Sequence, residues 1–154
     1  MALWQFVLYP IPASKISQFA FDDDDIQEMQ LSSRDRSALS FRLAAILPPG
    51  DPWDGDMRHW GDEERDDISF FMSDAGVEGL RVRVDVANLS VTFVSAICTL
   101  GRDFGWAFVS EAGEIIEPFP ESVLKAINQS PAREYVRDPA AFLARVARDH
   151  KRRN

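Results

Sequence analysis

Strict alternation of apolar and charged residues between positions 80 and 86 is the feature of this chain that most constrains its fold. Side chains of a β-strand point alternately to its two faces. One face would carry the apolar residues Leu80, Val82, Val84 and Val86. The other face would carry Arg81, Arg83 and Asp85. The pattern therefore predicts a strand within a sheet that has one buried and one charged face.

Further segments of the chain show strand or helix patterns. Alternating or clustered apolar residues between turn residues predict strands over residues 3–9, 68–72, 106–110 and 114–117. Apolar residues at helical spacing predict helices through residues 39–47, 89–100, 123–127 and 142–146. Ser130-Pro131 and Asp138-Pro139 each combine a capping residue with a proline at the first helical position, so both pairs indicate helix starts.

The order of these elements predicts an α+β fold. We expect a mainly antiparallel sheet with helices on one face, of ferredoxin-like character, with an added hairpin and C-terminal helices. A chain of 154 residues is long enough for one domain with its own core, so residues 1–154 are expected to form a single domain. The basic residues at 150–154 are expected to be a frayed tail.

Charge is distributed unevenly along the chain. The net charge is −8, yet residues 1–80 carry sixteen acidic and six basic residues, whereas residues 81–154 carry nine and eleven. A negative chain argues against binding to nucleic acid, which requires a basic face. The sequence shows no secretory signal pattern, no apolar run long enough to span a membrane and one cysteine, Cys98. We therefore expect a soluble cytoplasmic protein.

Residues 48–67 form the most unusual stretch. The sequence there shows no periodicity, and a connection of this length in a compact domain is usually functional or disordered. It holds eight acidic residues, Asp51, Asp54, Asp56, Asp62, Glu63, Glu64, Asp66 and Asp67. It also holds Trp53 and Trp60, and disordered linkers are poor in aromatic residues. We expect an acidic connection that is partly ordered, with at least one tryptophan packed on the body of the protein.

Motifs that would indicate an enzyme are missing from the sequence. It contains no phosphate-binding loop, dinucleotide fingerprint, nucleophile elbow or zinc-protease motif. The run Asp22–Asp25 does not have the ligand spacing of a calcium loop, and Asp25 with Glu28 also fits a helix cap. His59 is a conceivable general base but stands outside any motif, and Cys98 lies among apolar residues. The sequence thus favours a protein without catalysis, cofactor or metal.

Four short segments resemble a known class of proteins. They are Leu8-Tyr9-Pro10-Ile11-Pro12, Leu47-Pro48, Arg83-Val84-Asp85 and the stretch from Ser130-Pro131-Ala132-Arg133 through Asp138-Pro139 to Phe142-Leu143. Together they resemble small uncharacterised bacterial proteins, some of which are similar to immunity proteins of polymorphic toxin systems. The resemblance implies a role in binding and neutralising a toxin, and it carries over no catalytic residues.

Three functional hypotheses follow. The first is an acidic protein-binding module for a basic partner such as a toxin, with partner-binding residues Asp51, Trp53, Asp54, Asp56, Trp60, Asp62, Glu63 and Glu64. The second is a small-molecule enzyme or sensor with a cleft between the 48–67 segment and the sheet, lined by His59, Arg81, Arg83 and Asp85. The third is a homodimer that pairs through an open sheet face. None of the three involves a nucleic acid or a membrane.

Overall fold

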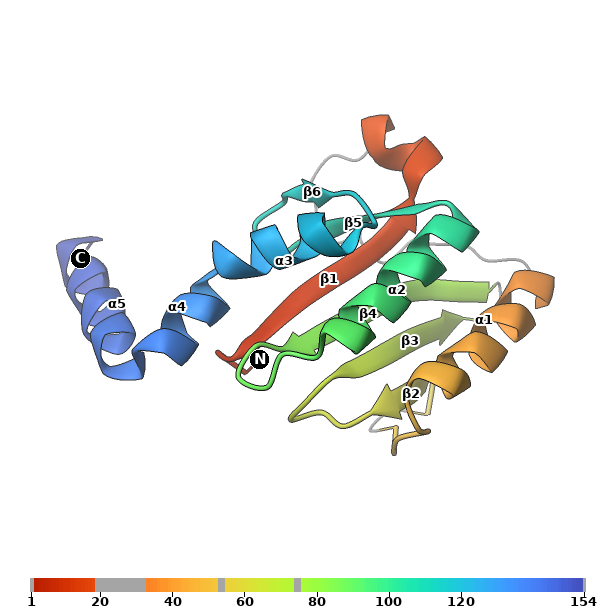
Figure 1. Ribbon diagram of the computed structural model, residues 1–154, viewed down its shortest axis with the longest axis horizontal. Coiled ribbons are helices and arrows are strands. Elements are labelled where there is room, and N and C mark those ends of the chain that lie inside the picture. The colour runs from red at the N-terminus through yellow and green to blue at the C-terminus, as the bar shows by residue number, and fades with distance from the viewer. Residues whose placement is uncertain (1, 19–32, 53–54, 74–75, 154) are drawn as a thin grey trace.

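The computed structural model describes residues 2–18, 33–52, 55–73 and 76–153 (Figure 1). Within them, six strands form one antiparallel sheet in the order β2-β3-β4-β1-β5-β6. The strands are β1 (Gln5–Pro12), β2 (Met57–Gly61), β3 (Asp67–Ser73), β4 (Gly76–Asp85), β5 (Trp106–Ser110) and β6 (Ile115–Ile116). Every neighbouring pair runs antiparallel, so β4 and β5, which both flank β1, run in the same direction.

Helices cover one face of this sheet. Figure 1 shows α1 (Ser33–Ile46), α2 (Val91–Phe104) and α3 (Pro120–Asn128) over the same face. The short η1 (Ala13–Gln18) follows β1 directly. Two further helices, α4 (Pro131–Arg137) and α5 (Pro139–Arg153), extend beyond the sheet, at the opposite end of the long axis from α1 (Figure 1). The predicted α+β class is confirmed.

The apolar and charged residues that alternate in β4 lie on opposite faces of the sheet, as predicted. Leu80, Val82 and Val84 are buried, while Arg81 and Arg83 on the opposite face are partly exposed. Val82 pairs with Leu8 of β1 and with Ile68 of β3, both fully buried, so three strands contribute to one apolar layer. The helix α2 packs on that layer with its own buried residues, among them Phe93, Ile97 and Leu100.

Cys98 belongs to this core. Its side chain on α2 is fully buried, and desolvation by burial raises the pKa of the thiol to about 11. The thiol is therefore protonated at neutral pH, and it packs as a small apolar group.

The segment 48–67 contains a strand that the sequence did not reveal. Met57–Gly61 form β2 at one edge of the sheet, paired with β3. Residues 48–50 run alongside, where the Gly50 amide donates to the His59 carbonyl at 2.9 Å and the Gly61 amide donates to the Pro48 carbonyl at 2.7 Å. The apolar periodicity of the sequence did not indicate β2, because the polar residue His59 is buried on the same face as Met57.

Two helices bury less than the sequence predicted. In α1, Leu39 and Leu43 are fully buried but Phe41 is 80% exposed, so the apolar stripe is narrower than its composition suggests. In α5, only Phe142 is buried, and Leu143 and Val146, which were expected in the core, are about half exposed. This helix continues to Arg153, so residues 150–153, the part of the expected frayed tail that the structure describes, are helical. Among the described residues, no helix combines the length and apolar character needed to cross a membrane.

Two phenylalanines test this description of the core. Phe70, which is fully buried, packs edge to face on Trp60 with ring centroids 5.0 Å apart. Phe70→Ala should lower the free energy of unfolding by about 3–5 kcal/mol through lost burial and the cavity left behind. Phe41→Ala, at an exposed position, should change it by less than about 0.5 kcal/mol. Urea unfolding monitored by circular dichroism gives both values, and equal losses would contradict this core.

Candidate functional site

The turn between β2 and β3 presents acidic side chains on a firmly held backbone. We call residues 62–66 the acidic turn. The Gln5 side-chain amide donates to the carbonyls of Glu63, at 2.9 Å, and of Arg65, at 2.7 Å. The Trp4 indole donates to the carbonyl of Glu64 at 3.1 Å. Two side chains from the start of the chain therefore bind three successive carbonyls of the turn.

Hydrogen bonds within the turn fix it further. The Asp62 amide donates to the Asp66 carbonyl at 3.2 Å, and the Arg65 amide donates to the Asp62 carbonyl at 2.9 Å. The Asp62 carboxylate accepts from the Glu64 amide at 2.9 Å. The chain enters through Gly61 at φ +92°, a left-handed conformation that favours glycine. Asp62, Glu63 and Glu64 remain exposed on this ordered backbone.

The structure separates the predicted partner-binding residues into three groups. Five of the predicted carboxylates are exposed: Asp51, Asp56, Asp62, Glu63 and Glu64. Trp60 is only 6% exposed and packs on Phe70, so it is a core residue and not the surface contact that the sequence suggested. The expectation that one tryptophan of this segment packs on the body is thereby confirmed. Trp53 and Asp54 lie outside the described residues.

The residues of the second hypothesis come together in part. His59, Arg81, Arg83 and Asp85 occupy the sheet face opposite the helices. His59 and Arg83 both bind Asp67, a fully buried carboxylate that the sequence analysis did not single out. The His59 Nε2 atom lies 2.9 Å from Asp67 Oδ2, and Arg83 donates to both carboxylate oxygens, with Nε at 2.7 Å from Oδ1. Asp67 pairs directly with Arg83 across β3 and β4, a register that sequence alone does not give.

The other two residues of that hypothesis make different contacts. The Arg81 guanidinium lies 5.5 Å from the centroid of the Phe71 ring. Burial, followed by the nearby charge of Arg83, lowers the pKa of Arg81, whereas the hydrogen bond to Asp67 raises the pKa of Arg83. Asp85 caps the end of β4 by accepting from the amides of Ala87 and Asn88 at 3.0 and 3.2 Å.

The backbone at Gly50 covers one side of the His59 ring. A Cβ atom at Gly50 would lie 2.2 Å from His59 Nδ1, so the chain runs against the imidazole ring. Nδ1 itself is buried and has no hydrogen-bond partner among the described residues. A general base must come within hydrogen-bond reach of its substrate. The cluster of His59, Asp67 and Arg83 instead joins β2, β3 and β4.

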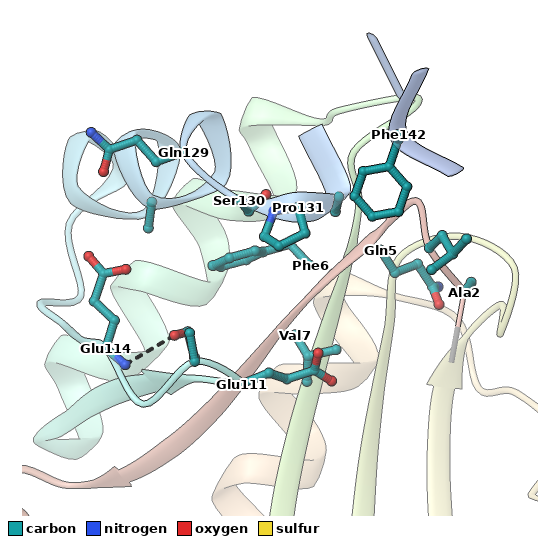
Figure 2. A pocket seen from close by; sticks show the side chains of 15 residues that line it. Ala2, Gln5, Phe6, Val7, Glu111, Glu114, Gln129, Ser130, Pro131 and Phe142 are labelled. Carbon is teal, nitrogen blue, oxygen red and sulfur yellow. Dashed lines mark hydrogen bonds between the residues drawn. The ribbon is translucent and has the colours of Figure 1, made fainter. Parts of the chain in front are cut away.

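A cavity of about 210 Å³ lies beside the start of β1, and no sequence pattern indicated it. Figure 2 shows Pro131 and Phe142 on its helical side and Val7 and Glu111 on its sheet side. The lining is mainly apolar, with the carboxylates of Glu111 and Glu114 among its polar groups. Gln5, which holds the acidic turn, is also part of the lining.

Metal binding finds no support in the part of the chain that the structure describes. No group of three or more histidine, cysteine, aspartate or glutamate side chains is arranged there to hold an ion. The run Asp22–Asp25 lies outside the described residues.

Comparison with protein-family models, with curated proteins and with solved structures gave no match to this chain. The resemblance to immunity proteins therefore stays a prediction, and function has to be argued from the geometry above.

The buried carboxylate gives a direct test of the strand-joining cluster. Asp67→Asn should lower the free energy of unfolding by about 3 kcal/mol, because it leaves the partly buried Arg83 charge without its counter-ion. Asp66→Asn is the matched control. Burial, together with the charges of Asp85 and Asp67, raises the pKa of Asp66, although the Asp85 amide that binds its carboxylate lowers it.

Ionised Asp66 is therefore unfavourable in the folded state, and asparagine keeps an oxygen that can accept from the Asp85 amide. The control should be at least as stable as the parent at pH 7, and its advantage should fade as the pH falls and Asp66 takes up a proton. Urea unfolding at pH 7 and pH 4 measures both effects. A similar loss at pH 7 in the two variants would show that Asp67 has no special role.

Two glycines test the geometry of the acidic turn. At Gly61, a Cβ atom would lie 2.3 Å from the Asp66 carbonyl oxygen, and φ is positive. Gly61→Ala should cost on the order of 1–3 kcal/mol and speed amide hydrogen exchange in residues 62–66. Gly55→Ala, where no atom lies within 4 Å, should leave stability and exchange nearly unchanged. Hydrogen exchange measured by mass spectrometry that is equal in both variants would refute this geometry.

Proposed function

We propose that this protein is a non-enzymatic binding module whose acidic turn docks on a basic protein partner. The observation that carries the proposal is the way the turn is held. Its carbonyls are bound by Trp4 and Gln5, while the side chains of Asp62, Glu63 and Glu64 stay exposed. A charged surface that is already ordered loses less conformational entropy on binding than a flexible one.

Electrostatics supports the same proposal. Acidic side chains on an exposed edge attract a basic protein and orient its approach, and this effect weakens with salt. Asp51 and Asp56 add two exposed carboxylates from the neighbouring part of the chain. A protein that neutralises a basic toxin, as the resemblance to immunity proteins implies, would use such an edge.

The buried cluster argues against catalysis as the leading hypothesis. His59 and Asp67 have the pairing of a general base with its orienting carboxylate, but both are buried and Arg83 binds the same carboxylate. In the proposed function these three residues keep β2 and β3 in place, and the turn between the two strands is thereby positioned.

A charge-reversal experiment tests the proposed function. The protein would be co-expressed with the products of the genes that flank its own, and any basic protein that co-purifies would be titrated by calorimetry at 50 and 300 mM salt. Reversal of Asp62, Glu63 and Glu64 to lysine should weaken binding by roughly tenfold or more at low salt and flatten the salt dependence.

The control has the same change in net charge at exposed acids elsewhere. Glu117, Glu121 and Asp149 changed to lysine should weaken the same complex by only about twofold, since these residues lie away from the turn. Equal effects of the two triple variants, or no binding by any of these basic proteins, would count against the proposal. Light scattering on the protein alone reports whether it forms a homodimer.

A further inference from the structure

We propose that the cavity beside β1 binds an apolar side chain flanked by lysine or arginine on the basic partner. This inference rests on the proposed function and deepens it, because it identifies where the partner's apolar contact enters. The cavity measures about 210 Å³, smaller than most sites for whole drug-sized molecules but large enough for one aliphatic or aromatic side chain.

The chemistry of the cavity is apolar inside and acidic at its mouth. Phe6, Val7, Ala126 and Phe142 line it and are buried. Glu111 and Glu114 belong to the same lining but are exposed, and both come from the turn between β5 and β6 (Figure 2). Such a cavity favours a group with an apolar end and a positive charge beside it.

Electrostatics at the mouth favours a cation in particular. Partial burial raises the pKa of the Glu111 carboxyl, and the positive charges of the N-terminus and of Arg81 offset this only in part. An ionised carboxylate that is incompletely hydrated gains more from a nearby cation than a fully hydrated one. A neutral or anionic group at the same place would not make this contact.

The walls of the cavity are held in position. Phe142 of α5 meets the Tyr135 ring of α4 edge to face, with centroids 5.7 Å apart, and Arg145 of α5 pairs with Glu134 of α4 at 2.8 Å. On the sheet side, the Ser110 hydroxyl accepts from the Glu114 amide at 3.2 Å, the bond drawn in Figure 2. These contacts keep the cavity formed before a ligand arrives.

Gln5 connects the cavity to the acidic turn. It is 4% exposed and lines the cavity, while its side-chain amide binds the carbonyls of Glu63 and Arg65. The Gln5 Oε1 atom is buried and has no hydrogen-bond partner among the described residues. Turn and cavity are therefore neighbours, so one partner surface can reach both, with charges on the turn and an apolar side chain in the cavity.

The test uses 2-phenylethylammonium as a probe of this chemistry and phenylacetate as its oppositely charged match. Alanine-methyl NMR of the whole protein provides the readout, because Ala126 and Ala132 line the cavity and Ala107 does not. The amine should shift the Ala126 and Ala132 signals with a Kd on the order of 1 mM, as expected of a ligand with few atoms. Phenylacetate should bind at least about tenfold more weakly.

Variants separate this inference from the proposed function. Glu111→Gln with Glu114→Gln should weaken amine binding about fivefold, whereas Glu117→Gln with Glu121→Gln should leave it unchanged. Ala126→Leu should block binding by filling the cavity. If that variant does not fold, the glutamine pairs alone decide the result.

Equal binding of amine and acid, no binding of the amine, or equal effects of the two glutamine pairs would overturn the inference. The proposed function would survive those results, since it depends on the charge reversals in the acidic turn. If the amine binds as expected but the reversals change nothing, the cavity remains a cation-selective site, and its assignment to a partner that docks on the acidic turn fails with the proposed function.

Discussion

One buried carboxylate joins β2, β3 and β4. Asp67 is fully buried and is bound by Arg83 of β4 and His59 of β2, so three strands meet at one side chain. Removing a carboxylate from water is unfavourable unless its oxygens are satisfied, and here both oxygens have charged or polar partners. The register of β2 on β3, and hence the place where the chain turns between them, follows from this cluster.

The acidic turn lies directly before the cluster of His59, Asp67 and Arg83, and hydrogen bonds fix both of its ends. Its last residue, Asp66, precedes the buried Asp67 and accepts from the Asp85 amide at 2.8 Å, so that end of the turn is fixed to β4. At the other end, the Gly61 amide donates to the Pro48 carbonyl. Gln5 and Trp4 bind the carbonyls in between. Of the acids in this region, Asp66 and Asp67 serve the fold, and Asp62, Glu63 and Glu64 remain exposed to solvent.

Periodicity predicted the parts of the fold in which one face is apolar. The alternation in β4, the apolar spacing in α2 and the capped prolines of α4 and α5 all correspond to elements of the structure. It did not reveal β2, because the buried face of that strand carries His59, and a histidine looks polar until its partner Asp67 is known. Periodicity also could not show which apolar residues remain exposed to solvent, as Phe41 does. Exposure depends on which neighbouring elements cover the side chain.

The sequence also could not predict sites that are made of residues far apart along the chain, because their contacts depend on the fold. The cavity joins residues of β1, the β5–β6 turn and α3 to α5, and Gln5, which belongs to it, also holds a turn about sixty residues away. Counting acids along residues 48–67 therefore located a charged region but gave Trp60 the wrong role, since that residue is in the core. In the proposed function, an apolar contact for the partner would come from elsewhere on the same edge. Because Gln5 touches both features, the cavity lies beside the turn that carries the exposed carboxylates, and in the proposed function charge and shape would act together on one partner.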